Sequence, residues 1–593
     1  MYWRKVLVLA TMSIALGASA SALFSQTANL PGRINKNGVE LDVRSHGRAL
    51  ADDLLINGNS AILNEESPAP GVDVVPQIQL RGDNEQVNDG ALDNIQVFSG
   101  FRPFIKFTQS ETSIAASGRN IVAVYNTSAN QPLVHITPTV LGFTQRFFSG
   151  FSTSGDGGKT WTSGFLPPAP GSVFTFGDPV AGVDRKGNFY FAGLGANAAG
   201  ASTIQVNKST DGGRTWSAAS IVQVDNGGDK EWMAVGPDPV VKNRDNVYVT
   251  WTSFQASGAQ LRFGRSTDGG ATWTAKTIFA PGTSPNPTNP QNSLQFSNPY
   301  VDPITGRLYV PFLHFSNADP DFIRILVSDD AGENFSFLNF NIAGAPSPSL
   351  LPIVQPGSLI DCGNSGGLRL AIRAGANIGG RFGFPSFVQA SRLVVQPAFA
   401  ARNGLLYLAW SNSTSASFGD LNSRSNVLFI RSTDGGQTWS APVQVNPVVT
   451  SDTQHVLPSL AIDNDSNDVH IAYYTQHSDG RVDLDMANSH DKGVSFPSNR
   501  TVRVTNTSFV LPPTNIRLSP PSGTSYNTTN YDRLVRACYS LGEYIGVTSA
   551  NGSVYTLWGG AQNTVTHPIN VLDPLSGVTH TQQDVFFQEV KAP

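Results

Sequence analysis

Apolar and polar residues alternate along most of the chain in a pattern that predicts short antiparallel strands. Seven segments each hold an apolar run, a polar turn and a second run that ends in an aromatic residue. Turn dipeptides such as Asn403-Gly404 and Asn551-Gly552 separate the runs, and such dipeptides between β-rich runs predict hairpins. The predicted hairpins cover residues 114–125, 180–191, 233–251, 300–312, 397–410, 460–473 and 545–558.

An octapeptide with the pattern S-x-D-x-G-x-T-W recurs between these hairpins. Its six copies begin 55 to 62 residues apart, except for one interval of 104 residues, and two copies close on Phe. A repeat of this period indicates stacked supersecondary units. In such a turn Asp and Ser accept backbone N–H groups, Gly supplies a positive φ, and the aromatic residue packs between neighbouring sheets. The structural aspartates of the six copies are Asp156, Asp211, Asp268, Asp330, Asp434 and Asp491.

Seven hairpins and six octapeptides together predict an all-β propeller of seven four-stranded antiparallel blades, with six blades as the alternative. The last blade would lack the octapeptide. We assign residues 94–593 to the propeller, with a Gly-rich insertion at about 343–393, and residues 25–93 to a partly ordered lead-in. To close the ring, residues 584–590 are expected to pair with an N-terminal strand such as residues 94–99.

Composition supports this architecture and excludes one class of partner. Charged residues make up 14% of the chain, beside 57 Gly and 38 Pro, which suits many short strands joined by tight turns. The formal net charge of −5 offers no basic surface, so nucleic acid is excluded as a partner.

The first 24 residues have the pattern of a cleaved secretory signal. Arg4 and Lys5 precede an apolar run that is too short to span a membrane comfortably, and small residues follow it. We therefore expect a secreted or periplasmic protein with no transmembrane segment in the mature chain. Cys362 and Cys538 are a disulfide candidate in such a compartment, with two separate buried thiols as the alternative.

The octapeptide is the Asp box, and through it the chain resembles the sialidase superfamily, in which these boxes lie on outer turns. The resemblance implies three arginines that hold a substrate carboxylate, a tyrosine activated by a glutamate, and an aspartate as acid/base. Glu111 stands near the position of the first arginine, and Glu543 and Tyr544 stand where the tyrosine is expected. The arginine triad is thus not recognisable, and seven blades depart from the family's six.

The starts of the innermost strands converge on the channel of a propeller, and here they are polar. We predict catalytic chemistry at Glu111, Asp178, Glu543 and Tyr544. We predict ligand binding at Asp229, Lys230, Glu231, Asn298, Gln396 and His455. No cofactor is required, although carboxylate and amide oxygens would suit Ca²⁺. A hydrated channel with an ordinary polar lining is the simpler alternative.

Two functions of different classes fit these observations. The first is an exported sialidase-like propeller that binds or processes a glycan in its central pocket, and any enzyme activity would then be that of a glycoside hydrolase. The alternative is a non-enzymatic protein-binding or adhesive propeller at the cell surface, in which the Gly-rich insertion would matter more than the channel. The boxes establish the fold and leave the reaction open, because function depends on the site.

Overall fold

The computed structural model describes the parts of the chain that form the strands and most of their turns. Described are residues 33–36, 39–42, 82–93, 109–127, 133–137, 140–143, 146–147, 149–172, 174–281, 290–316, 318–342, 345–347, 349–355, 396–416, 424–449, 453–510, 541–566 and 579–591. The signal-like residues 1–24, Cys362 and Cys538 lie outside these ranges. Among the described residues, none forms a helix with the length and apolar character needed to cross a bilayer.

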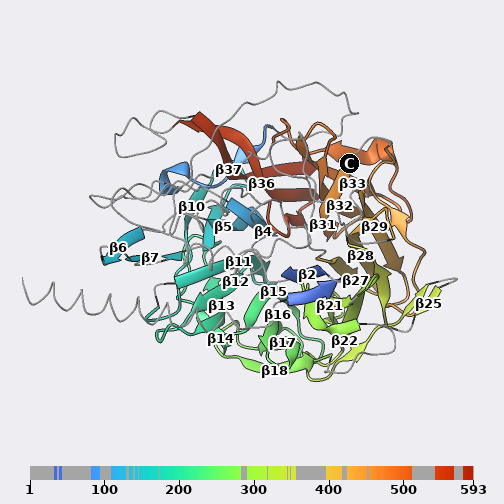
Figure 1. Ribbon diagram of the computed structural model, residues 1–593, viewed down its shortest axis with the longest axis horizontal. Coiled ribbons are helices and arrows are strands. Elements are labelled where there is room, and N and C mark those ends of the chain that lie inside the picture. Colours follow the sequence, from blue (N-terminus) through green and yellow to red (C-terminus); the bar gives the residue numbers. More distant parts are fainter. Residues whose placement is uncertain are drawn as a thin grey trace, which may run out of the picture.

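Seven antiparallel blades follow one another around a central axis, which confirms the predicted blade number and strand number (Figure 1). The hydrogen-bonded path within each blade runs outward from the channel. From the inside outward, blade 1 contains β4 (Gln109–Ser117), β5 (Asn120–Thr127), β9 (Ser149–Ser154) and β10 (Thr162–Phe165). Blade 2 contains β11 (Phe174–Val183), β12 (Phe189–Ala196), β13 (Ser202–Ser209) and β14 (Ser220–Val224). Blade 3 contains β15 (Gly228–Pro237), β16 (Asp245–Gln255), β17 (Gly258–Ser266) and β18 (Thr274–Phe279).

Blade 4 has a divided inner strand, and blades 5 and 6 repeat the regular order. Blade 4 contains β19 (Pro290–Gln295) and β20 (Tyr300–Val301), then β21 (Leu308–Ser316), β22 (Asp321–Ser328) and β23 (Ser336–Phe337), with β26 (Leu351–Ile353) added beside β22. Blades 5 and 6 contain β27 (Ala398–Arg402), β28 (Leu405–Ser413), β29 (Ser425–Ser432) and β30 (Val443–Gln444); and β31 (Gln454–Ile462), β32 (Val469–Gln476), β33 (Val482–Ser489) and β34 (Thr501–Arg503).

The seventh blade closes the ring with strands from both ends of the chain. It contains β35 (Gly546–Ala550), β36 (Ser553–Thr566), β37 (Thr579–Lys591) and, outermost, β3 (Glu85–Gln86). Glu85 pairs with Phe587 and Gln86 with Phe586. The closing strand thus precedes residue 94, where the sequence placed the start of the propeller, while residues 94–99 lie outside the described ranges. Little in a two-residue strand of Glu and Gln could signal this pairing beforehand.

Smaller elements lie outside the blade order. They are the two-stranded sheets β1 (Arg33–Lys36) with β2 (Val39–Asp42), β6 (Leu133–Thr137) with β7 (Val140–Phe143), and β24 (Phe340–Ile342) with β25 (Ala345–Ser347), the strand β8 (Arg146–Phe147) parallel to β11, and the 3₁₀ turns η1 (Gly90–Asp93) and η2 (Ser498–Arg500). β25 and β26 fall in the first part of the predicted insertion, and residues 356–395 lie outside the description.

Each Asp box occupies the turn between the third and fourth strands of its blade. In the fifth box, Asp434 accepts hydrogen bonds from the Ser432 hydroxyl at 2.7 Å, and from the Thr438 backbone N–H at 2.9 Å and hydroxyl at 2.6 Å. Blade 7 has no box because its third and fourth strands come from opposite ends of the chain, so no turn joins them. The strand order thus explains why seven blades carry six boxes.

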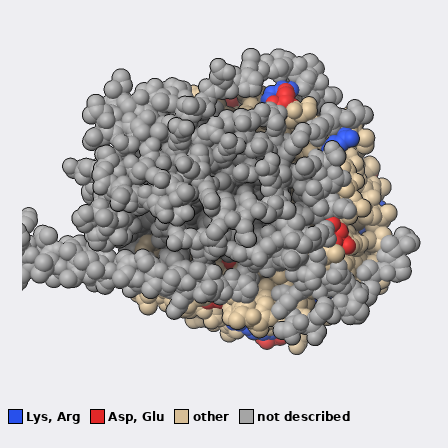
Figure 2. Space-filling model, viewed as in Figure 1, with Lys and Arg blue, Asp and Glu red and all other residues tan. Residues whose placement is uncertain are grey.

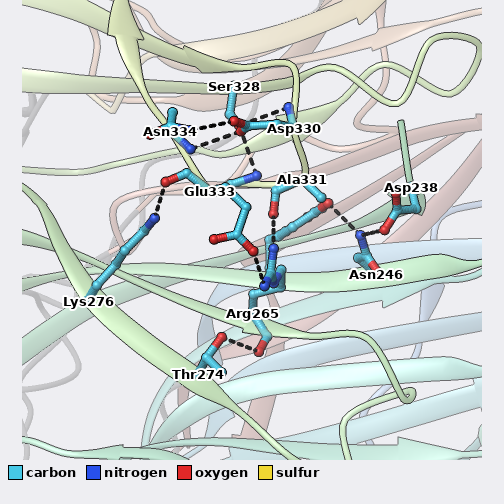
Figure 3. A network of polar contacts seen from close by, with 12 residues as sticks. Asp238, Asn246, Arg265, Thr274, Lys276, Ser328, Asp330, Ala331, Glu333 and Asn334 are labelled. Atoms are coloured by element: carbon cyan, nitrogen blue, oxygen red, sulfur yellow. Dashed lines mark hydrogen bonds and ion pairs between the residues drawn. The ribbon is translucent and has the colours of Figure 1, made fainter. Parts of the chain in front are cut away.

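The aromatic residue that closes each box packs against the preceding blade. Trp161 meets Phe587 of blade 7 at 5.1 Å between ring centroids, and Phe496 meets Phe429 of blade 5 at 5.0 Å. The fourth box is also fastened to blade 3 by polar contacts (Figure 3). Arg265 donates to the Ala331 carbonyl at 2.9 Å and to Glu333 at 2.6 Å. The boxes therefore join blades to one another at one end of the barrel of strands.

The hydrophobic core fills the seams between blades. Its largest fully buried side chains include Trp251, Trp410 and Trp558, each on the second strand of its blade. Full burial of one such side chain stabilises the fold by roughly 1.5–3 kcal/mol. These are the aromatic residues that end the predicted hairpins, so the sequence pattern identified part of the core.

Candidate functional site

The inner strands begin, at the end opposite the boxes, with irregular backbone that gathers charged side chains. Their pairing with the second strands is interrupted by register shifts, as between Ser110 and Ser113 in blade 1 and between Asp229 and Trp232 in blade 3. Within these bulges Glu111, Asp178 and Lys230 have φ of 52°, 57° and 49°. Left-handed backbone is costly for residues other than Gly, and such strain clusters at functional sites.

These bulges bring together what we call the carboxyl hub: Glu111, Asp178, Lys230, Glu231 and Glu543. The five residues come from blades 1, 2, 3 and the start of blade 7, and each is at most 1% exposed. Lys230 is in electrostatic contact with all four carboxyl groups, and its ammonium lies 3.7 Å from Glu543. The sequence predicted every member of this group, and the structure places them side by side.

Asn126 links the first two blades beneath the hub. Its amide Nδ2 donates to Glu111 at 2.6 Å, and its Oδ1 accepts the backbone N–H of Asp178 at 2.9 Å. Among the described residues, no other side chain donates a hydrogen bond to the carboxyl oxygens of Asp178 or Glu231, and Asp178 lies within hydrogen-bond reach of the Glu111 carboxyl group. Buried polar atoms of folded proteins are nearly always bonded, so unmatched carboxyl oxygens in a cluster are a mark of a site that takes a ligand.

Two aromatic rings form the side of the hub that faces the channel. The Lys230 ammonium lies 3.7 Å from the centre of the Tyr544 ring, and the Trp232 ring packs nearly perpendicular to that ring at 4.7 Å between centroids. The Tyr544 hydroxyl donates to the Pro179 carbonyl at 3.1 Å. Burial raises the pKa of Tyr544 well above its ordinary value. Tyr544 therefore holds Lys230 through its ring, and its hydroxyl is committed to the backbone of blade 2.

Proton affinities in the hub are shifted by burial and by crowding of like charges. Burial raises the pKa of Glu111 well above its ordinary value, Lys230 opposes this, and Asp178 and Glu543 add to it. The pKa of Glu231 is also raised, chiefly by burial. Burial acts to lower the pKa of Lys230, but the surrounding carboxyl groups outweigh it and the pKa is raised. The hub thus favours a charged lysine, and Glu111 and Glu231 hold their protons more firmly than an ordinary glutamate does.

The remaining predicted binding residues lie around the hub in separate contacts. Asp229 accepts a hydrogen bond from Gln295 at 3.1 Å, and Asn298 donates to the Pro397 carbonyl at 2.9 Å. Gln396 is buried next to Pro397, with its Oε1 without a partner.

His455 begins a polar chain along blade 6. Its Nδ1 lies 3.1 Å from the Thr475 hydroxyl, which donates to Asp485 at 2.5 Å. Burial lowers the pKa of His455 to about 3 and raises that of Asp485 to about 6. The Thr475 hydroxyl gives its one proton to Asp485, so in the contact between His455 and Thr475 the proton comes from His455 Nδ1. The other ring nitrogen, Nε2, is then an acceptor, and no described residue donates to it. His455 is thus a neutral hydrogen-bond acceptor.

A cavity of about 480 Å³ runs along the inner strands towards the box end, and the five hub residues are not among the residues that line it. Trp232 and Tyr544 line it at the end nearest the hub, and Asp184, Arg185 and Asn464 line it at the opposite end. Tyr300 and Phe399 add further aromatic surface. A volume of this size, with aromatic walls and a few polar groups, is typical of a small-molecule site.

Three residues of this site were missed by the sequence analysis. Asn126 and Gln295 bond to hub or neighbouring carboxyls, and Trp232 packs on Tyr544. Asn126 lies at the end of a second strand, and its partner Glu111 begins the first strand of the same hairpin, so pairing across the hairpin could have suggested it. Within the described ranges, no three His, Cys, Asp or Glu side chains are grouped as ligands of a metal ion. No step below uses one.

Comparison with known proteins agrees with the repeat. The BNR/Asp-box repeat model matches residues 430–441, which contain the fifth box. The chain carries BNR/Asp-box repeats. Among curated proteins, none matches the sequence.

Several solved structures resemble this propeller at low identity. A protein of unknown function from Dyadobacter fermentans is 12% identical, with a TM-score of 0.37, over 72% of this chain and 97% of its own. A Trypanosoma rangeli sialidase with the inhibitor DANA is 12% identical, with a TM-score of 0.33, over 88% of this chain and 60% of its own. A Hadza microbial sialidase is 14% identical, with a TM-score of 0.35, over 76% of this chain and 75% of its own.

Proposed function

We propose that this BNR-repeat propeller binds a carbohydrate at the carboxyl hub and acts on it by acid–base chemistry, with Glu111 as the proton donor. The observation that carries the proposal is the pair of buried carboxyls with raised proton affinity, Glu111 and Glu231, behind the Trp232 and Tyr544 rings that line an aromatic cavity. Glycoside hydrolysis uses a carboxylic acid that keeps its proton at neutral pH and a second carboxyl in a different environment. Asp178 and Glu543 are the candidates for the second group.

The charge of the hub favours a neutral sugar. Four carboxyl groups surround one ammonium, so an acidic sugar would bring a further negative charge into a crowded acidic site. Arg185 is the one arginine that lines the cavity within the described ranges, and it lies at the far end, where it pairs with Asp245. Recognition of a sugar carboxylate by an arginine fork therefore has no support at the hub.

The other hub residues have distinct parts in this proposal. Lys230 keeps the cluster from accumulating uncompensated negative charge, and Trp232, which is half-buried in the cavity wall, offers stacking surface to a sugar ring. Carboxyl oxygens of Glu231 would accept hydrogen bonds from sugar hydroxyls. Asn126 holds Glu111 in place.

The test is a glycan array with a parallel screen of chromogenic glycosides on the mature protein. We expect binding or cleavage of a neutral sugar, lost by at least about tenfold in Glu111→Gln and in Glu543→Gln, because removing a positioned proton donor typically costs 10²–10⁴-fold in rate. Glu333→Gln is the matched control, since Glu333 lies at a box and pairs with Arg265. Cleavage of a sialoside, or hub variants that bind and cleave like the wild type, would overturn the proposal.

The same screen separates the alternative function. A propeller that serves as a protein-binding platform would give neither binding nor cleavage of any glycan, and its partner binding would survive both hub substitutions.

We also propose that the protein is exported. The support is the pattern of residues 1–24, with Arg4 and Lys5 ahead of an apolar run. N-terminal sequencing of protein recovered outside the cytoplasm should begin just after small residues near residue 24, whereas a mature chain that begins at Met1 would contradict export by cleavage.

A further inference from the structure

A buried arginine that has no acidic partner among the described residues lies at the seam between blades 3 and 4, apart from the hub. Arg324 is on β22, where it pairs with Phe312 of β21, and it is 9% exposed. No ion pair joins it to a carboxylate among the residues that the structure describes. A buried cation without a counter-charge is costly, and proteins nearly always pair such a group.

Aromatic rings fix the plane of the Arg324 guanidinium. Its carbon lies 3.7 Å from the centre of the Phe337 ring of blade 4 and 4.9 Å from that of Phe279, the last residue of β18 in blade 3. Phe279 and Phe337 pack edge to face at 5.3 Å. Stacking holds the faces of a guanidinium and leaves the N–H groups along its edge free to bind in the plane.

The polar contacts of the guanidinium are few and long. Nη1 lies 3.4 Å from His314 Nδ1, and Nη2 donates to the Ser349 hydroxyl at 3.3 Å. Nε is buried with no partner. Burial lowers the pKa of Arg324 to about 10, so the group remains charged at neutral pH. Five N–H donors are therefore served by two weak neutral acceptors.

The repeat shows how unusual this environment is. The residue four places before the serine of the box is Arg262 in blade 3, Arg324 in blade 4 and Asp485 in blade 6. Each pairs across the sheet with an aromatic residue of the second strand, Trp251, Phe312 or Tyr473. Asp485 receives a short hydrogen bond from Thr475, whereas Arg262 is half-buried and 5.9 Å from the Trp251 ring. Only at Arg324, of these three, do two aromatic rings from adjacent blades enclose the charge.

We propose that Arg324 is the anchor of an oxyanion site, which takes the carboxylate, phosphate or sulfate group of a ligand at the seam between blades 3 and 4. A planar guanidinium pairs with two oxygens of such a group through two parallel N–H···O bonds. The Ser349 hydroxyl stands beside it to donate a further hydrogen bond. The site is independent of the hub, whose carboxyl groups would repel the same anions.

The experiment is a titration of the full-length mature protein with inorganic phosphate, sulfate and acetate, followed by calorimetry and by the ¹⁵N NMR signals of arginine Nε. We expect saturable binding of at least one anion, with the Arg324 Nε–H signal among those that shift. Arg324→Gln should weaken the binding at least tenfold. Arg324→Lys retains the charge but loses the two parallel N–H donors, so its anion affinity should lie between that of the wild type and that of Arg324→Gln. Arg262→Gln is the matched control and should bind like the wild type.

Several results would overturn the site. These are binding that is unchanged in Arg324→Gln, equal loss in Arg262→Gln, or no saturable binding of any of the three anions. If Arg324→Gln does not fold, Ser349→Ala keeps the guanidinium and should weaken binding about threefold or more, and an unshifted Arg324 Nε–H signal in the wild type would then contradict the proposal. Preference for phosphate and sulfate over acetate would assign the ligand group as tetrahedral, and the reverse as a carboxylate.

Discussion

The two ends of the blades hold carboxyl groups in opposite states. At the box end each Asp accepts several hydrogen bonds from its own turn, and although partial burial opposes it, these bonds lower the pKa of residues such as Asp211 and Asp434 to about 2. At the hub end burial and neighbouring carboxyls raise the pKa of Glu111 and Glu231. The same functional group is thus an ionised structural brace at one end and a neutral acid at the other.

This difference separates residues that hold the ring from residues that can do chemistry. A box supplies the donors that its carboxylate needs from within eight residues, so it works in isolation and can be repeated. The hub takes its members from four blades and leaves oxygens without donors. Where Figure 2 shows described residues, their charged atoms form a few small, separate groups.

The largest expected effect follows from removing the cation of the hub. Lys230→Met leaves four buried carboxyls without their ammonium, and breaking a buried pair in this way costs about 3–5 kcal/mol. Urea unfolding should show a loss of that size. Lys230→Met combined with Glu543→Gln should recover part of it, because one charge leaves with the lysine. A loss below about 1 kcal/mol would show that the hub does not depend on Lys230.

The next effect is the pH dependence of stability, which should have opposite signs for the two ends. A raised pKa in the folded state gives stability that is complete below the unfolded pKa of about 4 and is lost as pH rises through the folded value. Lowered box pKa values give stability that is present above about pH 4 and is lost as pH falls towards 2. Unfolding free energy should therefore rise from pH 2 to 4 and decline at higher pH.

Glu111→Gln isolates the contribution of the hub to this profile. Gln cannot ionise and still accepts the hydrogen bond from Asn126, so the decline above pH 4 should become shallower by about 1 kcal/mol or more, while the rise below pH 4 stays. Urea midpoints measured from pH 3 to 8 give the answer. An unchanged decline would mean that Glu111 carries no raised proton affinity.

A single box should contribute less than the hub lysine. Asp434→Ala removes an acceptor of three hydrogen bonds on an exposed turn, and we expect a loss of about 1–2 kcal/mol with glycan binding intact. Thermal unfolding and the glycan screen together test this. Loss of binding without loss of stability would reverse the roles that we assign to the two ends.

The smallest effect comes from an irregular box. Ala331 has a φ of 59°, where the corresponding residues of other boxes are Gly157, Gly212 and Gly269, and the left-handed conformation costs a residue with a Cβ roughly 1–2 kcal/mol. Ala331→Gly should stabilise the protein by about 0.5–1 kcal/mol, since unfolded-state entropy offsets part of the relief. Calorimetric melting should show the increase, and a decrease would indicate that the Ala331 side chain contributes packing.

The fold was more predictable than the site because the repeat carries its own local signals. Boxes and hairpin turns specify short-range hydrogen bonds, so the sequence predicted seven blades and the aromatic packing between them. The closing strand at Glu85 was not predicted, because two polar residues give no periodic pattern. Hub members could be identified from the starts of inner strands, whereas Arg324 could not, because its partners Phe279 and Ser349 are distant in the sequence.

The contrast between the two ends is tested most directly by a ¹³C NMR titration of side-chain carboxyl carbons in the wild-type protein, with Glu111→Gln and Asp434→Ala used to assign the two signals. We predict that Glu111 loses its proton well above the ordinary range for glutamate and that Asp434 loses its proton near pH 2. Titration of Glu111 at or below about pH 4, together with Asp434, would contradict the account, because the hub would then hold no neutral acid.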